Sequence, residues 1–403
     1  MMIRNYYPRI LWLLRDLDVG GMQKVAIRLI NEMDAESIVV LLKHGQLDSQ
    51  VHTCKYYVGL PDQDSRVGRL WNYGRIARRI ALLIDEERPD VVVTFGHSML
   101  VLGALSLYLT QHKAHFVPSI RSSFTELSQQ ERPLLDVVRW LTQYALRQAD
   151  IVIAVSRAIA EDVSRLGIAR DRVRVIYSGV DIAGIRALAA EPVSHPWVFD
   201  GIPIISSVGR LSREKNHQLL LRAVNLVRQR DRVRLWLVGD GDERVRLQDL
   251  TEGLGLEEDV FFWGFHTNPY KYVARSAMFV LSSLYEGFPN ALIEAMAVGV
   301  PVISTNCPTG PSEIIEHGHT GLLVPVNDAR AMADAILCVI QDQRLAQTLA
   351  ANARKAVERL DFSTTVRMFQ EAIIDATTRG AQGRTQCSQK HLSGVLKQRR
   401  TIR

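Results

Sequence analysis

The chain has 403 residues, which exceeds the length of about 250–300 residues at which a single hydrophobic core stops growing. With 47% hydrophobic and 23% charged residues, its composition is that of an ordinary globular protein and excludes wholesale disorder. The net charge of +6 comes from residues 379–403, which hold seven Lys and Arg residues and no carboxylate, so the nearly neutral remainder predicts no nucleic-acid partner.

Short apolar runs alternate with longer segments of helical spacing, which is the pattern of a parallel sheet covered by helices. Because the pattern occurs twice, we predict two doubly wound α/β domains. The strands of the first half are predicted at Ile10–Leu14, Ile38–Leu42, Val91–Phe95, Phe116–Ile120, Ile151–Ala154 and Val173–Tyr177. Those of the second half are predicted at Pro203–Val208, Arg234–Val238, Val260–Trp263, Ala277–Leu281, Pro301–Ser304 and Gly321–Val324. Helices are expected after Asp328, around residues 345–360 and over 363–378.

The proline-containing stretch of residues 190–200 shows no sustained period and separates the two halves. We predict an N-terminal domain over 1–190, a linker over 191–201 and a C-terminal domain over 202–378, whose last helix packs back on the N-terminal domain. Residues 379–403 are expected to form a disordered basic tail. Ligands of open α/β sheets bind beyond the carboxyl ends of the strands, so two facing domains predict a cleft between them.

No segment has the features of export or membrane insertion. The apolar run Met99–Leu109 is shorter than the about 20 residues that a membrane span needs. Residues 10–14 are too few for a signal-peptide core and run directly into Arg15 and Asp16. The four cysteines lack paired spacing, which argues against a disulfide framework and a zinc site. We expect a cytoplasmic protein with reduced thiols.

Residues 281–303 contain the most informative motif, which reads as strand, glycine-containing loop, helix, glycine stop and strand. Pro289 suits the start of the helix, where its missing N–H would have no partner, and Gly299 suits the end.

Two carboxylates frame the start of this helix, Glu286 in the loop and Glu294 in the second turn. Between them lie the backbone N–H groups of Gly287, Phe288 and Asn290. Amides at a helix start favour anionic phosphate, whereas carboxylates accept hydrogen bonds from sugar hydroxyls. The motif therefore indicates a sugar-nucleotide site, with a pair of solvated surface glutamates as the alternative.

This motif resembles the signature of the retaining glycosyltransferases of the GT-B fold, family 4, in which seven residues separate two glutamates. The resemblance covers nearly all of residues 200–330 and, more loosely, the first half. It implies two Rossmann-like domains that face each other across a cleft. It also implies transfer of a hexosyl or N-acetylhexosaminyl group from a nucleotide-diphosphate sugar to a saccharide acceptor, with retention of configuration. The setting that it implies is bacterial surface-polysaccharide synthesis, such as lipopolysaccharide or exopolysaccharide, with no cofactor and no metal ion.

Four residues of the second half acquire roles from this resemblance. It implies that Glu294 binds the ribose, that Glu286 meets the donor sugar, and that Arg210 and Lys215 hold the diphosphate. Fixed cations would stabilise the negative charge that develops on a departing nucleoside diphosphate. An ordinary surface turn is the alternative for the two cations.

Residues that follow predicted strands in the first half are further candidates. Gly20 and Gly21 open a helix and resemble the family's glycine-rich loop near the donor phosphate, although a tight turn would also explain them. His97 stands where family members often place a catalytic-site histidine, and a structural histidine is the alternative. Arg121 also points to the cleft, where it would contact acceptor or phosphate.

Two other motifs are weaker. Residues 238–244 lack the third glycine of a dinucleotide-binding fingerprint, because Arg244 stands in its place. Asp240 and Asp242 resemble a metal-binding pair of the other glycosyltransferase fold, but that fold has a single domain, so we predict no metal site. Near Phe265 the resemblance suggests contacts to the nucleobase.

Residues 66–84 have the pattern of a basic amphipathic helix, which can lie against anionic lipid. Its basic residues are Arg66, Arg69, Arg75, Arg78 and Arg79, and its aromatic residues are Trp71 and Tyr73. A helix that simply covers a sheet is the alternative. Together with the basic tail, this helix predicts peripheral attachment to the inner face of the cytoplasmic membrane and a lipid-linked saccharide acceptor.

Two other functions remain open on the same sequence. A sugar-nucleotide epimerase or hydrolase of this fold would consume the donor without a saccharide acceptor. A non-catalytic sugar-binding protein would bind sugar without binding a nucleoside diphosphate.

Overall fold

The computed structural model describes residues 7–18, 20–59, 66–122 and 135–378, with only the backbone described at 66–71 and 135–138. The basic tail predicted over 379–403 therefore lies outside the described residues. The chain forms two compact units. The described residues up to Ile176, with those from Val366 onward, form unit 1, and Tyr177–Thr365 form unit 2.

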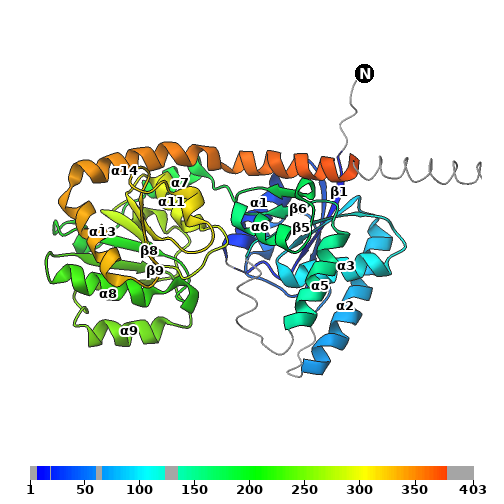
Figure 1. Ribbon diagram of the computed structural model, residues 1–403, viewed down its shortest axis with the longest axis horizontal. Coiled ribbons are helices and arrows are strands. Elements are labelled where there is room, and N and C mark those ends of the chain that lie inside the picture. The colour runs from blue at the N-terminus through cyan, green and yellow to red at the C-terminus, as the bar shows by residue number, and fades with distance from the viewer. Residues whose placement is uncertain (1–6, 19, 60–65, 123–134, 379–403) are drawn as a thin grey trace, which may run out of the picture. The chain divides into compact units, whose positions relative to one another are not determined.

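Unit 1 is built on a seven-stranded parallel sheet with helices packed on it (Figure 1). The strand order is β3-β2-β1-β4-β5-β6-β7. The strands are β1 Arg9–Leu14, β2 Glu36–Leu41, β3 Cys54–Tyr57, β4 Val91–Phe95, β5 His115–Ile120, β6 Val152–Ala154 and β7 Val173–Val175. The helices are α1 Gly21–Glu32, α2 Arg66–Glu87, α3 His97–Leu109, α5 Leu135–Gln148 and α6 Arg157–Arg165, with short 3-10 turns η1 Asp48–Gln50 and η2 Arg170–Arg172.

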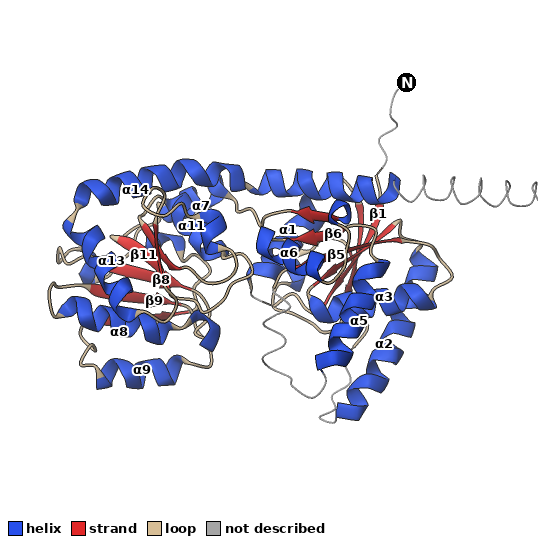
Figure 2. Ribbon diagram, viewed as in Figure 1, coloured by secondary structure: helices blue, strands red, loops and turns tan. Residues whose placement is uncertain are grey.

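Unit 2 is built on a six-stranded parallel sheet of order β10-β9-β8-β11-β12-β13 (Figure 2). The strands are β8 Ile204–Val208, β9 Arg234–Val238, β10 Val260–Gly264, β11 Met278–Leu281, β12 Val302–Thr305 and β13 Leu322–Val324. The α-helices are α7 Ile182–Ala189, α8 His217–Arg228, α9 Arg244–Gly253, α10 Tyr270–Val273, α11 Asn290–Val298, α12 Pro311–Ile314, α13 Ala329–Gln341 and α14 Gln343–Ala356. The 3-10 turns are η3 Pro196–Val198, η4 Arg213–Lys215 and η5 Val357–Leu360.

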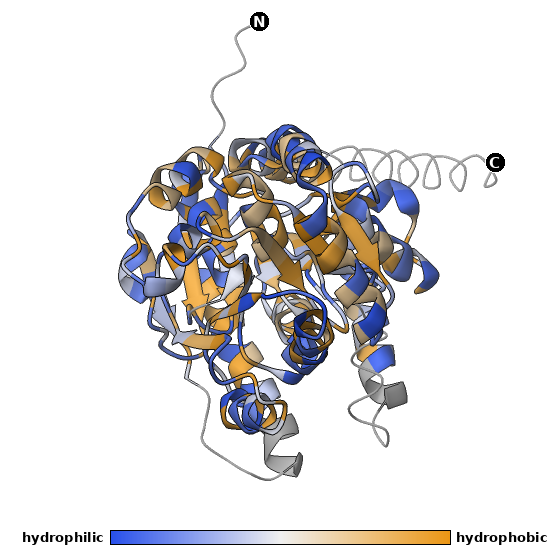
Figure 3. Cartoon of the chain, turned by 90° about the vertical axis from the view of Figure 1, so that its left-hand side faces the viewer, coloured by the Kyte–Doolittle hydropathy of each residue, from blue (hydrophilic) through white to orange (hydrophobic). Residues whose placement is uncertain are grey.

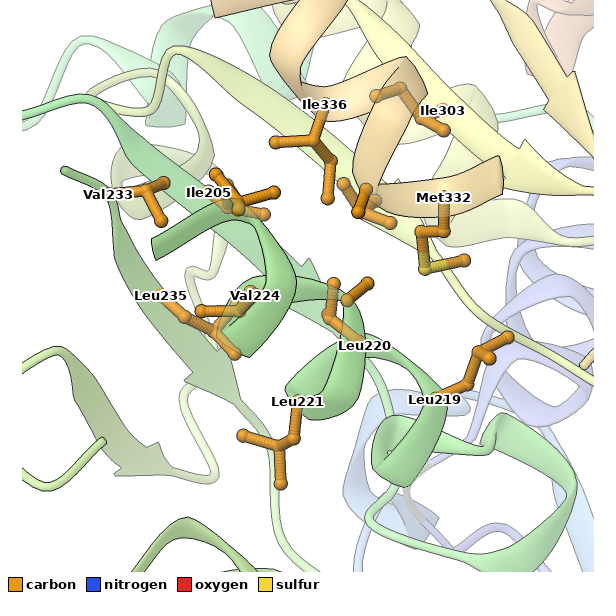
Figure 4. Packing of buried hydrophobic residues seen from close by; sticks show 14 of the residues in the cluster. Ile205, Leu219, Leu220, Leu221, Val224, Val233, Leu235, Ile303, Met332 and Ile336 are labelled. Atoms are coloured by element: carbon orange, nitrogen blue, oxygen red, sulfur yellow. The ribbon is translucent and has the colours of Figure 1, made fainter. Parts of the chain in front are cut away.

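One core of unit 2 lies between its sheet and the helices α8 and α13. Leu220 and Val224 of α8 and Ile336 of α13 pack against strand residues such as Ile205 and Leu235 (Figure 4). The strands are mostly apolar, whereas the covering helices carry apolar and polar residues on different faces (Figure 3). Each fully buried aliphatic side chain contributes about 1.5–3 kcal/mol relative to an exposed one, so this pattern holds the helices on the sheet.

The predicted fold class is confirmed, and every predicted strand overlaps a strand of the structure. Sequence patterning missed only β3 among the described strands, Cys54–Tyr57, which pairs with β2 at the edge of the sheet. None of its residues is fully buried, so it lacks the continuous apolar run that marks a strand covered on both faces.

The chain enters unit 2 at Tyr177, earlier than the predicted linker 191–201. Helix α7 packs against α10 and α11, which makes it part of unit 2 although it precedes that linker. The segment by which the chain leaves unit 2 lies beside the segment by which it enters, because the N–H of Val180 donates to the carbonyl of Leu360 at 3.0 Å. A last helix over residues 362–378 then places Phe369 on Phe95 of unit 1, with ring centroids 6.4 Å apart.

Gly239 follows β9 in a conformation that favours glycine, with φ at +145°, and lies against Gly209 after β8. A Cβ at Gly239 would stand 1.9 Å from the Gly209 carbonyl oxygen. We expect Gly239→Ala to lower the free energy of unfolding by about 3 kcal/mol, because it adds both backbone strain and a steric clash. Urea unfolding of the full chain measures this change.

Gly253→Ala is the matched control. A Cβ at Gly253, at the end of α9, would meet nothing within 4 Å. This variant should keep or slightly raise the stability of the protein, by up to about 1 kcal/mol. Equal stability of the two variants would show that the close approach of Gly239 to Gly209 does not affect the free energy of unfolding.

Candidate functional site

The strand order of unit 2 reverses between β8 and β11, which are neighbours in the sheet. At such a switch point the loops that follow the two strands diverge, and a ligand site forms between them. Arg210 and Lys215 lie in the loop after β8, and Glu286 lies in the loop after β11. Parallel pairing therefore brings together residues that are far apart in the sequence.

Lys215 and Glu286 form the central contact of this site. The Lys215 Nζ lies 2.6 Å from Glu286 Oε1, and the Ser283 hydroxyl donates to the same oxygen at 2.6 Å. The Glu286 side chain is only 9% exposed, so the ammonium group compensates for the cost of burying its charge. Among the described residues, none donates a hydrogen bond to the other carboxylate oxygen, Oε2. A sugar hydroxyl could donate to it.

Backbone N–H groups surround this ion pair. Those of Gly287, Phe288 and Asn290 donate to no acceptor in the described part of the chain. Helix α11 begins at Asn290 after Pro289 and ends at Gly299, whose φ of +96° is the left-handed conformation expected of a glycine stop. The start of α11 thus presents free donors and a positive helix end, both of which favour an anion.

Glu294, Arg210 and Phe265 are the other predicted site residues of unit 2, and they lie in different parts of it. Glu294 lies half-buried in the second turn of α11, and Arg210 is exposed two residues after β8. Phe265 is 54% exposed and follows β10, the edge strand. Two strand spacings, about 10 Å, separate β10 from β8. The structure therefore joins Lys215 to Glu286 directly, but it gives Phe265 no contact with either of them.

Unit 1 has its own switch point between β1 and β4, where Gly20 and His97 follow the two strands. Gly20 is extended, with φ at −171°, and precedes the first residue of α1. The His97 Nε2 lies 3.1 Å from the Ser122 carbonyl oxygen, which can only accept, so Nε2 carries the proton and Nδ1 is an acceptor. Burial lowers the pKa of His97 to about 4, so the ring is neutral near pH 7.

Arg121 follows β5 at the same edge of the sheet. Its guanidinium carbon lies 5.5 Å from the centre of the Phe95 ring. Burial lowers the pKa of Arg121 to about 10, which leaves the group positively charged near pH 7. This edge of unit 1 thus offers a neutral hydrogen-bonding ring and a cation, beside the start of α1.

Two family models match the chain. The model described as Glycosyltransferase Family 4 matches residues 19–183, and the model described as Glycosyl transferases group 1 matches residues 197–356. Together they cover about four fifths of the sequence. The chain belongs to the family 4 glycosyltransferases. The predicted resemblance to this family is confirmed.

Individual relatives of this glycosyltransferase family member act on bacterial glycans. An N-acetylgalactosamine-N,N'-diacetylbacillosaminyl-diphospho-undecaprenol 4-alpha-N-acetylgalactosaminyltransferase of Campylobacter jejuni is 31% identical over 226 residues, 56% of this chain and 60% of that protein. The lipopolysaccharide core biosynthesis glycosyltransferase LpsE of Rhizobium meliloti is 33% identical over 231 residues, 57% of this chain and 63% of that protein. The matches thus span about three fifths of these relatives.

The GT-B fold is also that of a solved structure, Anabaena Alr3699/HepE in complex with UDP. The TM-score is 0.75 at 23% sequence identity, with 91% of this chain and 99% of that chain covered.

Sequence reasoning missed several side chains around the site of this family 4 member. His217, the first residue of α8, is 3% exposed, and burial together with the charge of Lys215 lowers its pKa to about 4. Its Nδ1, the Thr309 hydroxyl and the Asn290 amide oxygen are buried without a hydrogen-bond partner among the described residues. Unpartnered buried polar atoms are uncommon in proteins, and a bound ligand would give these atoms partners. Their positions in the segments that follow β8, β11 and β12 are the sequence signal that could have revealed them.

The described residues show neither a metal-ion cluster nor a helix able to span a membrane. No group of three or more His, Cys, Asp or Glu side chains there is arranged to hold a metal ion. Within the same part of the chain, no helix combines the length and the apolar character that crossing a bilayer requires.

Proposed function

We propose that this protein is a glycosyltransferase that moves a hexosyl or N-acetylhexosaminyl group from a nucleotide-diphosphate sugar to a saccharide acceptor. The observation that carries the proposal is the Lys215–Glu286 contact of 2.6 Å at the switch point of unit 2, next to the free amides that begin α11. One arrangement thus offers a cation and amides for phosphate and a carboxylate for sugar.

Breaking the bond between sugar and diphosphate leaves negative charge on the departing phosphate. Lys215 and the exposed Arg210 would neutralise this charge from fixed positions, so the proposed reaction requires no metal ion or other cofactor. Glu286 Oε2 would accept a hydrogen bond from the donor sugar, and Glu294 would accept from the ribose hydroxyls. In unit 1, the neutral His97 would contact the sugar, and Gly20 and Gly21 would approach the phosphate.

The stereochemistry and the acceptor rest on family likeness. Members of this family retain the anomeric configuration, so we propose front-face substitution, in which the leaving phosphate takes the proton of the acceptor hydroxyl. The name of the Campylobacter relative describes an undecaprenol-linked acceptor, and that of the Rhizobium relative describes lipopolysaccharide core synthesis. A lipid-linked saccharide in surface-polysaccharide synthesis is therefore the acceptor that we propose. Phe265 and Arg121 are proposed contacts to the nucleobase and to the acceptor, respectively.

Removing either Lys215 or Glu294 should impair transfer without unfolding the protein. We expect Lys215→Ala to lower kcat by about 100-fold or more, the usual effect of losing one fixed group that stabilises transition-state charge. Glu294→Ala should lower kcat/KM by about 10- to 100-fold, because the ribose loses its hydrogen bonds to a charged group. Lys271→Ala is the matched control, because Lys271 lies 3.8 Å from Glu191 and not in the site. Near-normal turnover in either site variant would refute the assignment.

The same assay separates the other activities. Donor consumption with and without a saccharide acceptor is measured for uridine, guanosine and adenosine diphosphate sugars. A transferase consumes donor in step with acceptor glycosylation, whereas an epimerase or hydrolase consumes it without acceptor. Thermal stabilisation by sugar alone, with none by any nucleoside diphosphate, would instead indicate a sugar-binding protein.

We also propose that the outward face of α2 contacts an anionic membrane. Arg75, Arg78 and Arg79 are exposed, whereas the neighbouring Ile76 and Ile80 are buried. Leu82 extends the same face and is 68% exposed. The side chains of Arg66, Arg69 and Trp71 lie outside the described residues. A face with outward arginines and an exposed leucine suits the boundary between lipid headgroups and acyl chains.

Charge reversal on α2 should release the protein from anionic vesicles. Each basic residue near such a surface contributes about 1 kcal/mol, so Arg75→Glu with Arg78→Glu should weaken binding by about thirtyfold or more. Co-sedimentation with phosphatidylglycerol and phosphatidylcholine vesicles measures this effect. Reversal of Arg165 and Arg170, exposed residues elsewhere in unit 1, makes the same charge change and should have little effect. Equal, salt-insensitive recovery with both lipids would count against the proposal.

A further inference from the structure

A cavity of about 390 Å³ opens in unit 1 between the end of α3, the loop after it and α5. Its volume falls within the range of about 300–1,000 Å³ that is usual for small-molecule sites. Its aromatic and polar lining includes Tyr108, Gln111, Lys113, Tyr144, Gln148 and Asp150.

This cavity lies at the edge of the sheet opposite the candidate catalytic residues. Residues 110–114 precede β5, and Gln148 precedes β6, so the cavity borders the amino ends of these strands. His97 and Arg121 follow β4 and β5 and therefore lie at the carboxyl ends. A strand of the length of β5 spans about 20 Å, so the cavity is a separate site.

Aromatic rings line the cavity and continue beyond it. Tyr108 is 73% exposed and Tyr144 is 37% exposed, so both rings are accessible to a ligand. Trp140, one helical turn before Tyr144, is 62% exposed and stacks on it, with ring centroids 6.0 Å apart and planes 19° apart. The C–H face of a pyranose ring packs on such a flat surface, and successive sugar units need successive rings.

The polar groups of the cavity suit hydroxyl ligands. Gln111, Gln148 and Lys113 make no side-chain hydrogen bond with any residue that the structure describes, so their amide and ammonium groups can serve a ligand. Asp150 Oδ2 accepts from the Phe116 N–H at 2.8 Å, which leaves Oδ1 as an acceptor. Sugar hydroxyls both donate and accept hydrogen bonds. The ammonium and amide N–H groups can donate to them, and the carboxylate and amide oxygens can accept from them.

We propose that this cavity, with the Trp140–Tyr144 stack, is an accessory saccharide-binding site that holds a distal part of the acceptor or product glycan. The inference rests on the proposed glycosyltransferase function, because a growing glycan is the saccharide that such an enzyme meets. A lipid surface fits less well, since the site is concave and combines one lysine with a carboxylate.

Isothermal titration calorimetry of the full chain with maltoheptaose and chitohexaose tests the proposal. Tyr108→Ala with Tyr144→Ala should weaken binding of the better saccharide by about tenfold or more, because two ring contacts are lost. Gln148→Leu keeps the bulk of the side chain and should weaken binding severalfold by removing the amide. Phe199→Ala is the matched control, since Phe199 is 80% exposed but lies outside the cavity.

The outcomes separate this proposal from the proposed function. Failure of the wild-type protein to bind either saccharide, or unchanged affinity in the tyrosine variant, would overturn the accessory site. If the tyrosine variant loses vesicle binding but keeps its saccharide affinity, the aromatic surface binds lipid and the accessory-site proposal is overturned. Thermal stabilisation by nucleoside diphosphates, measured on the same samples, reports on the donor site independently.

Discussion

The ion pair between Lys215 and Glu286 is the interaction on which the candidate site depends. A glutamate that is almost entirely buried needs a counter-charge, and the ammonium group 2.6 Å away supplies it. The Ser283 hydroxyl donates to the same oxygen, which fixes the carboxylate and directs Oε2 away from the pair. Negative charge arriving on a phosphate would compete with Glu286 for Lys215, and this competition links donor binding to the geometry of the carboxylate.

Parallel topology explains why the site forms where it does. Every strand of both sheets runs in the same direction within its unit, so all carboxyl ends of a sheet reach one edge. At a switch point, the loops that follow two neighbouring strands run in opposite directions, and the first few residues of the two loops lie side by side. Apolar strand patterns alone were sufficient to predict this arrangement, because each buried strand appears in the sequence as a short apolar run. The half-exposed edge strand β3 has no such run, which is why it was missed.

The sequence could predict which residues follow strands, but not which of them touch. Lys215 and Glu286 are distant in the chain, and only the pairing of β8 with β11 brings them together. The burial of His217 and the unpartnered amide oxygen of Asn290 depend on packing around α8 and α11, which periodicity does not reveal. The boundary between the units differs from the predicted linker for a similar reason. The packing of α7 against other helices of unit 2 makes it part of that unit, and the prolines that follow α7 do not mark the boundary.

A crystal structure with a nucleoside diphosphate, chosen as the one that most raises the melting temperature, tests the role of Lys215 and Glu286 most directly. The Lys215 Nζ and the Arg210 guanidinium should then lie about 2.7–2.9 Å from phosphate oxygens, the distance of charge-assisted hydrogen bonds. Glu294 should accept from the ribose hydroxyls, with Glu286 Oε2 facing the vacated sugar position. A nucleotide bound elsewhere, or phosphates that do not touch Lys215, would contradict the assignment.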